Sequence, residues 1–127
     1  MITVLPVKEK EKIQELFKSN GVEYNNFSAV VEATEKDVSV GYCLFYLTET
    51  NITVEKIEPV NDIFLADGIL RSALHVAVCN NINTAFYGDN APVEMLRKLK
   101  FILNEETKEL NINKLFESCC GCADKNT

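Results

Sequence analysis

Residues 38–48 carry apolar side chains at both odd and even positions, and this pattern constrains the fold more than any other in the chain. The even positions from 38 to 46 hold valine, tyrosine and leucine, and the odd positions from 43 to 47 hold cysteine, phenylalanine and leucine. Successive side chains of a β-strand point to opposite faces of its sheet. A strand that is apolar on both faces is buried on both, so this segment predicts a central strand.

Two more strands are predicted beside it, joined by short polar connections. Residues 27–33 are apolar and partly β-branched, and residues 52–58 alternate before Pro59 ends the pattern. Residues 35–37 and the pair at 50–51 are polar and fit turns between the three segments. Short connections join antiparallel neighbours, so residues 27–58 predict an antiparallel meander.

Two longer stretches repeat their apolar residues at helical spacing. Residues 8–20 place Ile13, Leu16 and Phe17 on one face, and residues 66–80 continue such a pattern through the segment. The second helix would join strand 52–58 to a short strand at 84–87, a connection typical of parallel pairing. The remaining predicted elements are a strand at 3–7, a helix at 92–99 and a last hairpin of residues 101–103 and 109–112.

The length and charge of the chain exclude several classes of protein. Its 127 residues suit one domain, which we place at residues 1–118, followed by a cysteine-containing tail at 119–127. The net charge of −6 repels phosphate backbones, and the basic run at 97–100 is short, so we expect no nucleic-acid partner. The chain starts without a signal-peptide pattern, and no apolar stretch approaches the roughly 20 residues that cross a bilayer. We therefore expect a cytoplasmic protein without a membrane partner.

The order of these elements resembles that of the GNAT acetyltransferase superfamily. The resemblance covers residues 2–101 and is sharpest over 57–101, where Ile57-Glu58-Pro59 resembles the end of the family's fourth strand. Residues 65–74 resemble its acyl-CoA loop and the helix that follows. The resemblance implies an α/β fold with a mixed, mostly antiparallel central sheet flanked by helices. It also implies that acetyl-CoA or another acyl-CoA donates an acyl group to an amine on a small molecule or a protein.

The loop would hold the CoA pyrophosphate through backbone N–H groups at a helix start, a natural anion site. The residues that the resemblance assigns to this role are Asp67, Gly68, Ile69, Leu70, Arg71 and Ser72. The family pattern runs Arg or Gln, two residues, Gly, one residue, then Gly or Ala, and this chain has Leu65 and Leu70 at its two ends. Alternatively, Asp67 is an ordinary helix cap with Gly68 in the first turn.

An acid on the family's fourth strand often deprotonates the attacking amine, which makes Glu55 and Glu58 the candidate catalytic residues. They are three residues apart, so on a regular strand they face opposite sides and only one could face a cleft. The alternative is that both are solvated strand charges. Leu96 stands where many members have a tyrosine acid, and it donates no proton. An acyltransferase and a non-catalytic binding module of the same fold therefore both remain as hypotheses.

Three cysteines near the end of the chain, Cys119, Cys120 and Cys122, form the most unusual local feature. Cys119 and Cys122 have the two-residue gap of many zinc knuckles and redox pairs. A closed zinc site needs four ligands, so Cys43, His75 or Cys79 would have to complete it. The cluster therefore adds a third hypothesis, that of a metal- or thiol-handling protein. The alternative is a reduced tail without metal. His75 also shares a helix stripe with Arg71 and Cys79, as a small polar site or as a helix edge that faces solvent.

Overall fold

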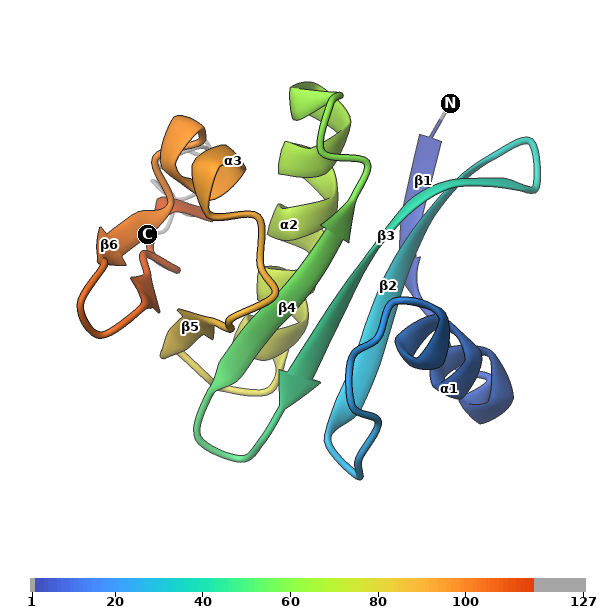
Figure 1. The fold of residues 1–127 in the computed structure, drawn as a ribbon, viewed down its shortest axis with the longest axis horizontal. Coiled ribbons are helices and arrows are strands. Elements are labelled where there is room, and N and C mark those ends of the chain that lie inside the picture. The colour runs from blue at the N-terminus through green and yellow to red at the C-terminus, as the bar shows by residue number, and fades with distance from the viewer. Residues whose placement is uncertain (1, 116–127) are drawn as a thin grey trace.

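The computed structural model describes residues 2–115 of the chain. These residues form seven strands and three helices in the predicted order (Figure 1). The elements are β1 (Ile2–Pro6), α1 (Lys10–Ser19), β2 (Ser28–Glu35), β3 (Val38–Leu47), β4 (Ile52–Glu58), α2 (Ile63–Cys79), β5 (Ala85–Tyr87), α3 (Val93–Lys98), β6 (Ile102–Asn104) and β7 (Glu109–Leu110). Every predicted strand and helix is present, and most bounds differ by one to three residues.

All seven strands lie in one sheet with the order β1-β2-β3-β4-β5-β7-β6. β4 and β5 pair in parallel, and every other neighbouring pair is antiparallel. The predicted mixed, mostly antiparallel sheet is thus confirmed. The β2–β3 hairpin turns on Lys36 and Asp37, which have positive φ angles of 54° and 67°. Two such residues form the tight turn whose twist matches that of paired strands.

Helices cover both faces of the sheet, as the two-sided pattern of β3 requires. Cys43 and Phe45 point into the larger core, which α2 covers together with α3 and residues near β7. Leu44 points to the other face, where it meets Phe17 of α1 and Val30 of β2 in a smaller core. Figure 1 shows α1 beside β2 and α2 behind β4. The central position of β3 follows because both of its faces are buried.

The second half of the sheet is shorter and carries α3 near its edge. Leu96 of α3 is fully buried in the larger core, together with Phe101 just after the helix. Among residues 2–115, no helix is long and apolar enough to cross a membrane. The boundary at residue 118, the cytoplasmic location and the lack of a nucleic-acid partner stay predictions.

Candidate active site

Glu55 occupies an irregular position in β4. Phe45 of β3 pairs with Val54, and the next residue back along β3, Leu44, pairs with Lys56. Glu55 is therefore an extra residue in β4 and has no direct partner on β3. Such β-bulges bend a strand and re-aim side chains, and they are common beside active sites.

The bulge lies where β4 and β5 part. The parallel pairing ends with Val54 and Tyr87, and the amide of Gly88 then donates to the Val54 carbonyl at 2.8 Å. Beyond this point β4 continues to Glu58 and α2, whereas the chain after β5 turns away towards α3 (Figure 1). Glu55 is the first residue of β4 past the parallel pairing, so its side chain lies at the fork between the two strands.

The carboxylate of Glu55 fills the space beside Gly88. A Cβ added at residue 88 would overlap both carboxylate oxygens of Glu55. Glu55 is 8% exposed and is the only buried polar or charged side chain within residues 2–115. Gly88 was predicted only as part of a loop and not as a site residue.

Burial raises the pKa of Glu55 above its ordinary value, because desolvation penalises the charged form. A hydrogen bond with the Asn90 side chain opposes this and lowers the pKa, as does the charge of Lys108, while the charge of Asp89 raises it further. A nearly buried carboxyl with a raised pKa has the properties of a general base or acid.

The bulge also changes which face of the sheet the side chains of Glu55 and Glu58 point to. Glu58 pairs with Tyr42 and so shares its face, which is the face covered by α1. Glu55 lies towards the same face. Tyr87 of β5 points into the larger core on the other face, so a Cβ at the next residue, Gly88, would point away from that core, and there it would meet the Glu55 carboxylate. The prediction that the two acids face opposite sides is therefore wrong. The extra residue in β4 shifts the alternation on which that prediction depended.

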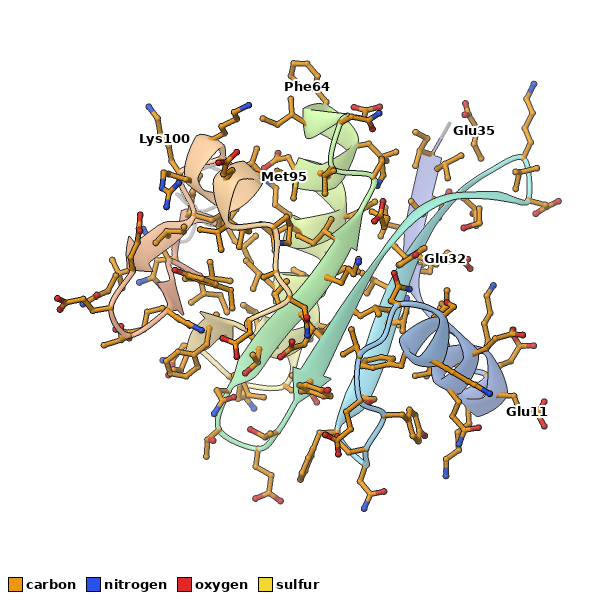
Figure 2. All side chains as sticks on the ribbon, in the orientation of Figure 1. Glu11, Glu32, Glu35, Phe64, Met95 and Lys100 are labelled. Carbon is orange, nitrogen blue, oxygen red and sulfur yellow. The ribbon has the colours of Figure 1, made fainter. Side chains whose placement is uncertain are left out.

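The predicted loop at residues 66–68 is also wrong, because α2 begins earlier. Its N-cap is Asp62, whose side chain accepts a hydrogen bond from the Leu65 amide at 3.1 Å. Asp67 is therefore not the cap but lies in the second turn, where it forms an ion pair of 2.9 Å with Arg71. The segment was misplaced because its first turn carries the exposed Phe64 (Figure 2) and so lacks a clear amphipathic pattern.

This earlier start affects the residues predicted to hold CoA. Gly68 and Ser72 lie inside α2, where backbone amides donate to the carbonyls four residues earlier. Ile69 and Leu70 are fully buried in the larger core. The amides of residues 68–72 are thus engaged within the helix and do not form an open phosphate cradle.

A cleft lies between the start of α2 and α3. It has a volume of about 640 Å³. Its walls come from residues before and at the start of α2 and from the segment that leads into α3, and they include Val60, Asn61, Ile63, Ala91, Pro92, Met95 and Lys98. We call it the α2–α3 cleft. It adjoins the Glu55 region, because the amide of Ala91 in its wall donates to the Gly88 carbonyl at 3.2 Å, and Gly88 lies against the Glu55 carboxylate.

The histidine and cysteines predicted as metal ligands separate into two groups. Cys43 is fully buried, and burial raises the pKa of its thiol. Cys79 is exposed, and its Sγ lies 3.5 Å from Nδ1 of His75. Within the described part of the chain, no three metal-ligating side chains come together. Cys119, Cys120 and Cys122 lie outside the described residues.

The architecture is that of GNAT acetyltransferases, as the sequence predicts. A protein from Desulfovibrio desulfuricans described as a GNAT-family acetyltransferase superposes with a TM-score of 0.54 at 14% identity, over 79% of this chain and 83% of that one. The ribosomal-protein-S18-alanine N-acetyltransferase of Escherichia coli superposes with a TM-score of 0.55 at 11% identity, over 86% and 88%. No protein-family model matches the sequence, and no curated protein matches it. The fold is therefore GNAT-like.

Proposed function

We propose that this protein is an N-acyltransferase that uses an acyl-CoA donor and Glu55 as its general base. The observation that supports the proposal best is the position of Glu55, buried at a bulge where β4 and β5 part. A base must reach the proton of the attacking amine, and its pKa should lie near the working pH. Burial raises the pKa of Glu55 and so moves it from the ordinary carboxyl value towards the working pH.

In this reaction the thioester supplies an activated acyl carbon. The amine nitrogen attacks that carbon, a C–N bond forms and the C–S bond breaks. Glu55 accepts the proton that the amine nitrogen loses, directly or through one water molecule. The departing thiolate takes its proton from solvent, because the fully buried Leu96 occupies the position where the resemblance implies a tyrosine. The identity of the amine, small molecule or protein, is left to a substrate screen.

The α2–α3 cleft fits the pantetheine arm better than the phosphates of CoA. Val60, Ile63 and Met95 provide apolar walls for an extended aliphatic arm. Lys98 and the N-terminal end of α2 favour an anion, but Glu94 of the same cleft opposes one. The phosphates would therefore be held by charge at the cleft mouth and not by the amides of residues 68–72.

A non-catalytic module of the same fold is the second candidate function. It is supported by α2 itself, because the helix runs through the segment where the resemblance places the phosphate loop. In that case the α2–α3 cleft would take an uncharged or short ligand, and Glu55 would have no proton to accept.

Two measurements separate these candidates. Thermal unfolding with millimolar acetyl-CoA tests binding, since a ligand of the native state raises its stability by mass action. Transfer of radiolabelled acetyl groups to a panel of amines tests catalysis. The label is counted in the amine product, so the cysteine thiols of the chain do not interfere as they would in an assay of released CoA thiol. We expect stabilisation and transfer, with transfer reduced about 10²–10⁴-fold in Glu55→Gln.

Glu58→Gln is the matched control, because it removes the neighbouring acid of the same strand. We expect its rate to stay within about tenfold of the unchanged protein, since Glu55 alone would act as base. Stabilisation without transfer to any amine would favour the non-catalytic module. No stabilisation and no transfer would exclude acetyl-CoA as the donor and contradict the proposal for that donor.

A further inference from the structure

The turn between β6 and β7 lies beside the segment that carries Gly88. It spans residues 105–108 and is stabilised from within. The side chain of Asn104 accepts hydrogen bonds from the amides of Glu106 at 2.8 Å and Thr107 at 3.3 Å. Such bonds from a side chain to nearby backbone amides hold a turn in shape. Lys108, the last residue of the turn, therefore extends from a well-supported backbone.

Lys108 contacts the chain after β5 at two points. Its carbonyl accepts a hydrogen bond from the Tyr87 amide at 2.9 Å, which extends the pairing of β5 with β7 by one residue. Its ammonium group forms an ion pair with Asp89. The hydrogen bond from Lys108 and its charge lower the pKa of Asp89, so both partners are charged at neutral pH. The two contacts lie on either side of Gly88 in the chain.

Gly88 is thus flanked by two tethered neighbours, and it is the residue that lies against Glu55. Its amide donates to the Val54 carbonyl at 2.8 Å, which ties it to β4. A Cβ at this position would overlap the Glu55 carboxylate, so the backbone of Gly88 forms one side of the space that the carboxylate occupies. A displacement of residues 88–89 would therefore open this space to water.

We propose that Lys108 is a positioning residue of the candidate active site and that it acts by holding Asp89. The ion pair keeps Gly88 against the Glu55 carboxylate and so keeps that carboxylate nearly buried. The side chain of Lys108 is 45% exposed and that of Asp89 is 87% exposed, so the pair contributes little to global stability and its effect is local. The effect of Lys108 on acyl transfer rests on the proposed function, whereas its effect on Gly88 does not.

Two substitutions separate the position of Gly88 from the charge near Glu55. Lys108→Met removes a positive charge and Asp89→Ala removes a negative one, but both break the same ion pair. Beyond the effect of burial, the charge of Asp89 raises the pKa of Glu55 and the charge of Lys108 lowers it. An effect of charge alone would therefore have opposite signs in the two variants, and an effect of position would have the same sign in both.

The position of Gly88 is tested by native-state hydrogen exchange of its amide, measured by NMR and corrected for the intrinsic rate of each variant. Exchange should be about two- to fivefold faster in both Lys108→Met and Asp89→Ala, the factor that an exposed ion pair supplies. Lys108→Arg keeps the ion pair and should restore slow exchange. Methionine and arginine both keep a Cβ at residue 108, where φ is 61°, so the backbone of the turn is matched.

Lys10→Met is the charge control, because it removes an exposed lysine at the start of α1 and should leave the exchange of Gly88 unchanged. Exchange that is unchanged in both Lys108→Met and Asp89→Ala, or that changes in opposite directions, would overturn the proposal.

Acyl transfer gives the second measurement. The rates are compared at pH values where transfer no longer rises, so that Glu55 is ionised in every protein. We expect kcat to fall about two- to fivefold in Lys108→Met and in Asp89→Ala, with recovery in Lys108→Arg. The double variant should lose no more than either single variant, because the two residues act as one unit.

The two measurements separate this proposal from the proposed function. An active protein in which both single variants transfer at the unchanged rate would overturn the positioning role. Faster exchange at Gly88 in both variants, with no transfer by the unchanged protein, would support the placement of Gly88 by Lys108 and contradict the proposed function alone.

Discussion

The carboxylate of Glu55 occupies the space that a side chain at Gly88 would need. The two residues are 33 positions apart in the chain, and they meet because β4 and β5 pair in parallel up to Val54 and Tyr87. The glycine lets a bulged, buried acid sit at the fork between the strands. The position and burial of Glu55 therefore depend on residue 88 having no side chain.

Gly88→Ala should displace the Glu55 carboxylate. Its backbone does not have the positive φ that would disfavour alanine, so the effect comes from the overlap. We expect a loss of about 1–3 kcal/mol in the free energy of unfolding, the usual cost of an overpacked site. Urea denaturation measures it.

A double-mutant cycle shows whether the loss arises at Glu55. In the background of Glu55→Ala, the cost of Gly88→Ala should largely disappear, because the two residues share one space. Equal costs in both backgrounds would mean that the alanine clashes with something other than the carboxylate.

Gly68→Ala should have the opposite effect and stabilise the protein. Gly68 lies inside α2, and a Cβ there meets nothing within 4 Å. Alanine is favoured over glycine in a helix interior by about 0.5–1 kcal/mol. The same urea titration measures the gain, and a destabilised variant would mean that residue 68 belongs to a loop after all.

Asp62→Ala should destabilise the protein more than Asp67→Ala does. Asp62 caps α2 by accepting the Leu65 amide, and loss of such a cap costs about 1 kcal/mol. Asp67 forms an ion pair with Arg71 at i and i+4, a pair that contributes about 0.2–0.5 kcal/mol. Chemical denaturation of both variants compares the two values. The reverse order would place the helix start at Asp67.

The contribution of Glu55 to the stability of the protein should fall as the pH rises above the ordinary carboxyl value of 4.5 and through the raised pKa of Glu55. In that range the folded state binds more protons than the unfolded state, so raising the pH favours unfolding. Glu55→Gln removes this term. We therefore expect the free energy of unfolding of Glu55→Gln, minus that of the unchanged protein, to increase with pH across this range.

Denaturant titrations of both proteins at matched pH values give this difference directly and cancel the contributions of other groups. A difference for Glu55→Gln that stays flat or decreases with pH would show that Glu55 is not desolvated in the folded state.

The periodicity of the sequence predicted most of the architecture. The strand at 52–58 has the predicted bounds. β3 lies in the interior of the sheet, as its apolar residues on both faces predicted. The parallel pairing of β4 with β5 followed from the strand–helix–strand order. These features depend on patterns within single segments, which is why they can be read from one chain.

The candidate site was predicted only in part. Glu55 was named as a candidate base, but its bulge, its burial, Gly88 and Asn90 were not foreseen. A bulge is a mismatch between two paired strands, so it depends on the register with β3 and has no signature within β4 alone. The start of α2 was placed too late, because its first turn carries the exposed Phe64 and its cap is read only from geometry.

The sequence by itself thus determined the order, type and approximate bounds of the elements, because alternation and helical spacing are local properties. Tertiary structure alone decided which acid is buried, which glycine makes room for it and which backbone amides are engaged within α2. Those outcomes depend on distances between segments that are far apart in the chain. The close approach of the Glu55 carboxylate to Gly88 is one such distance.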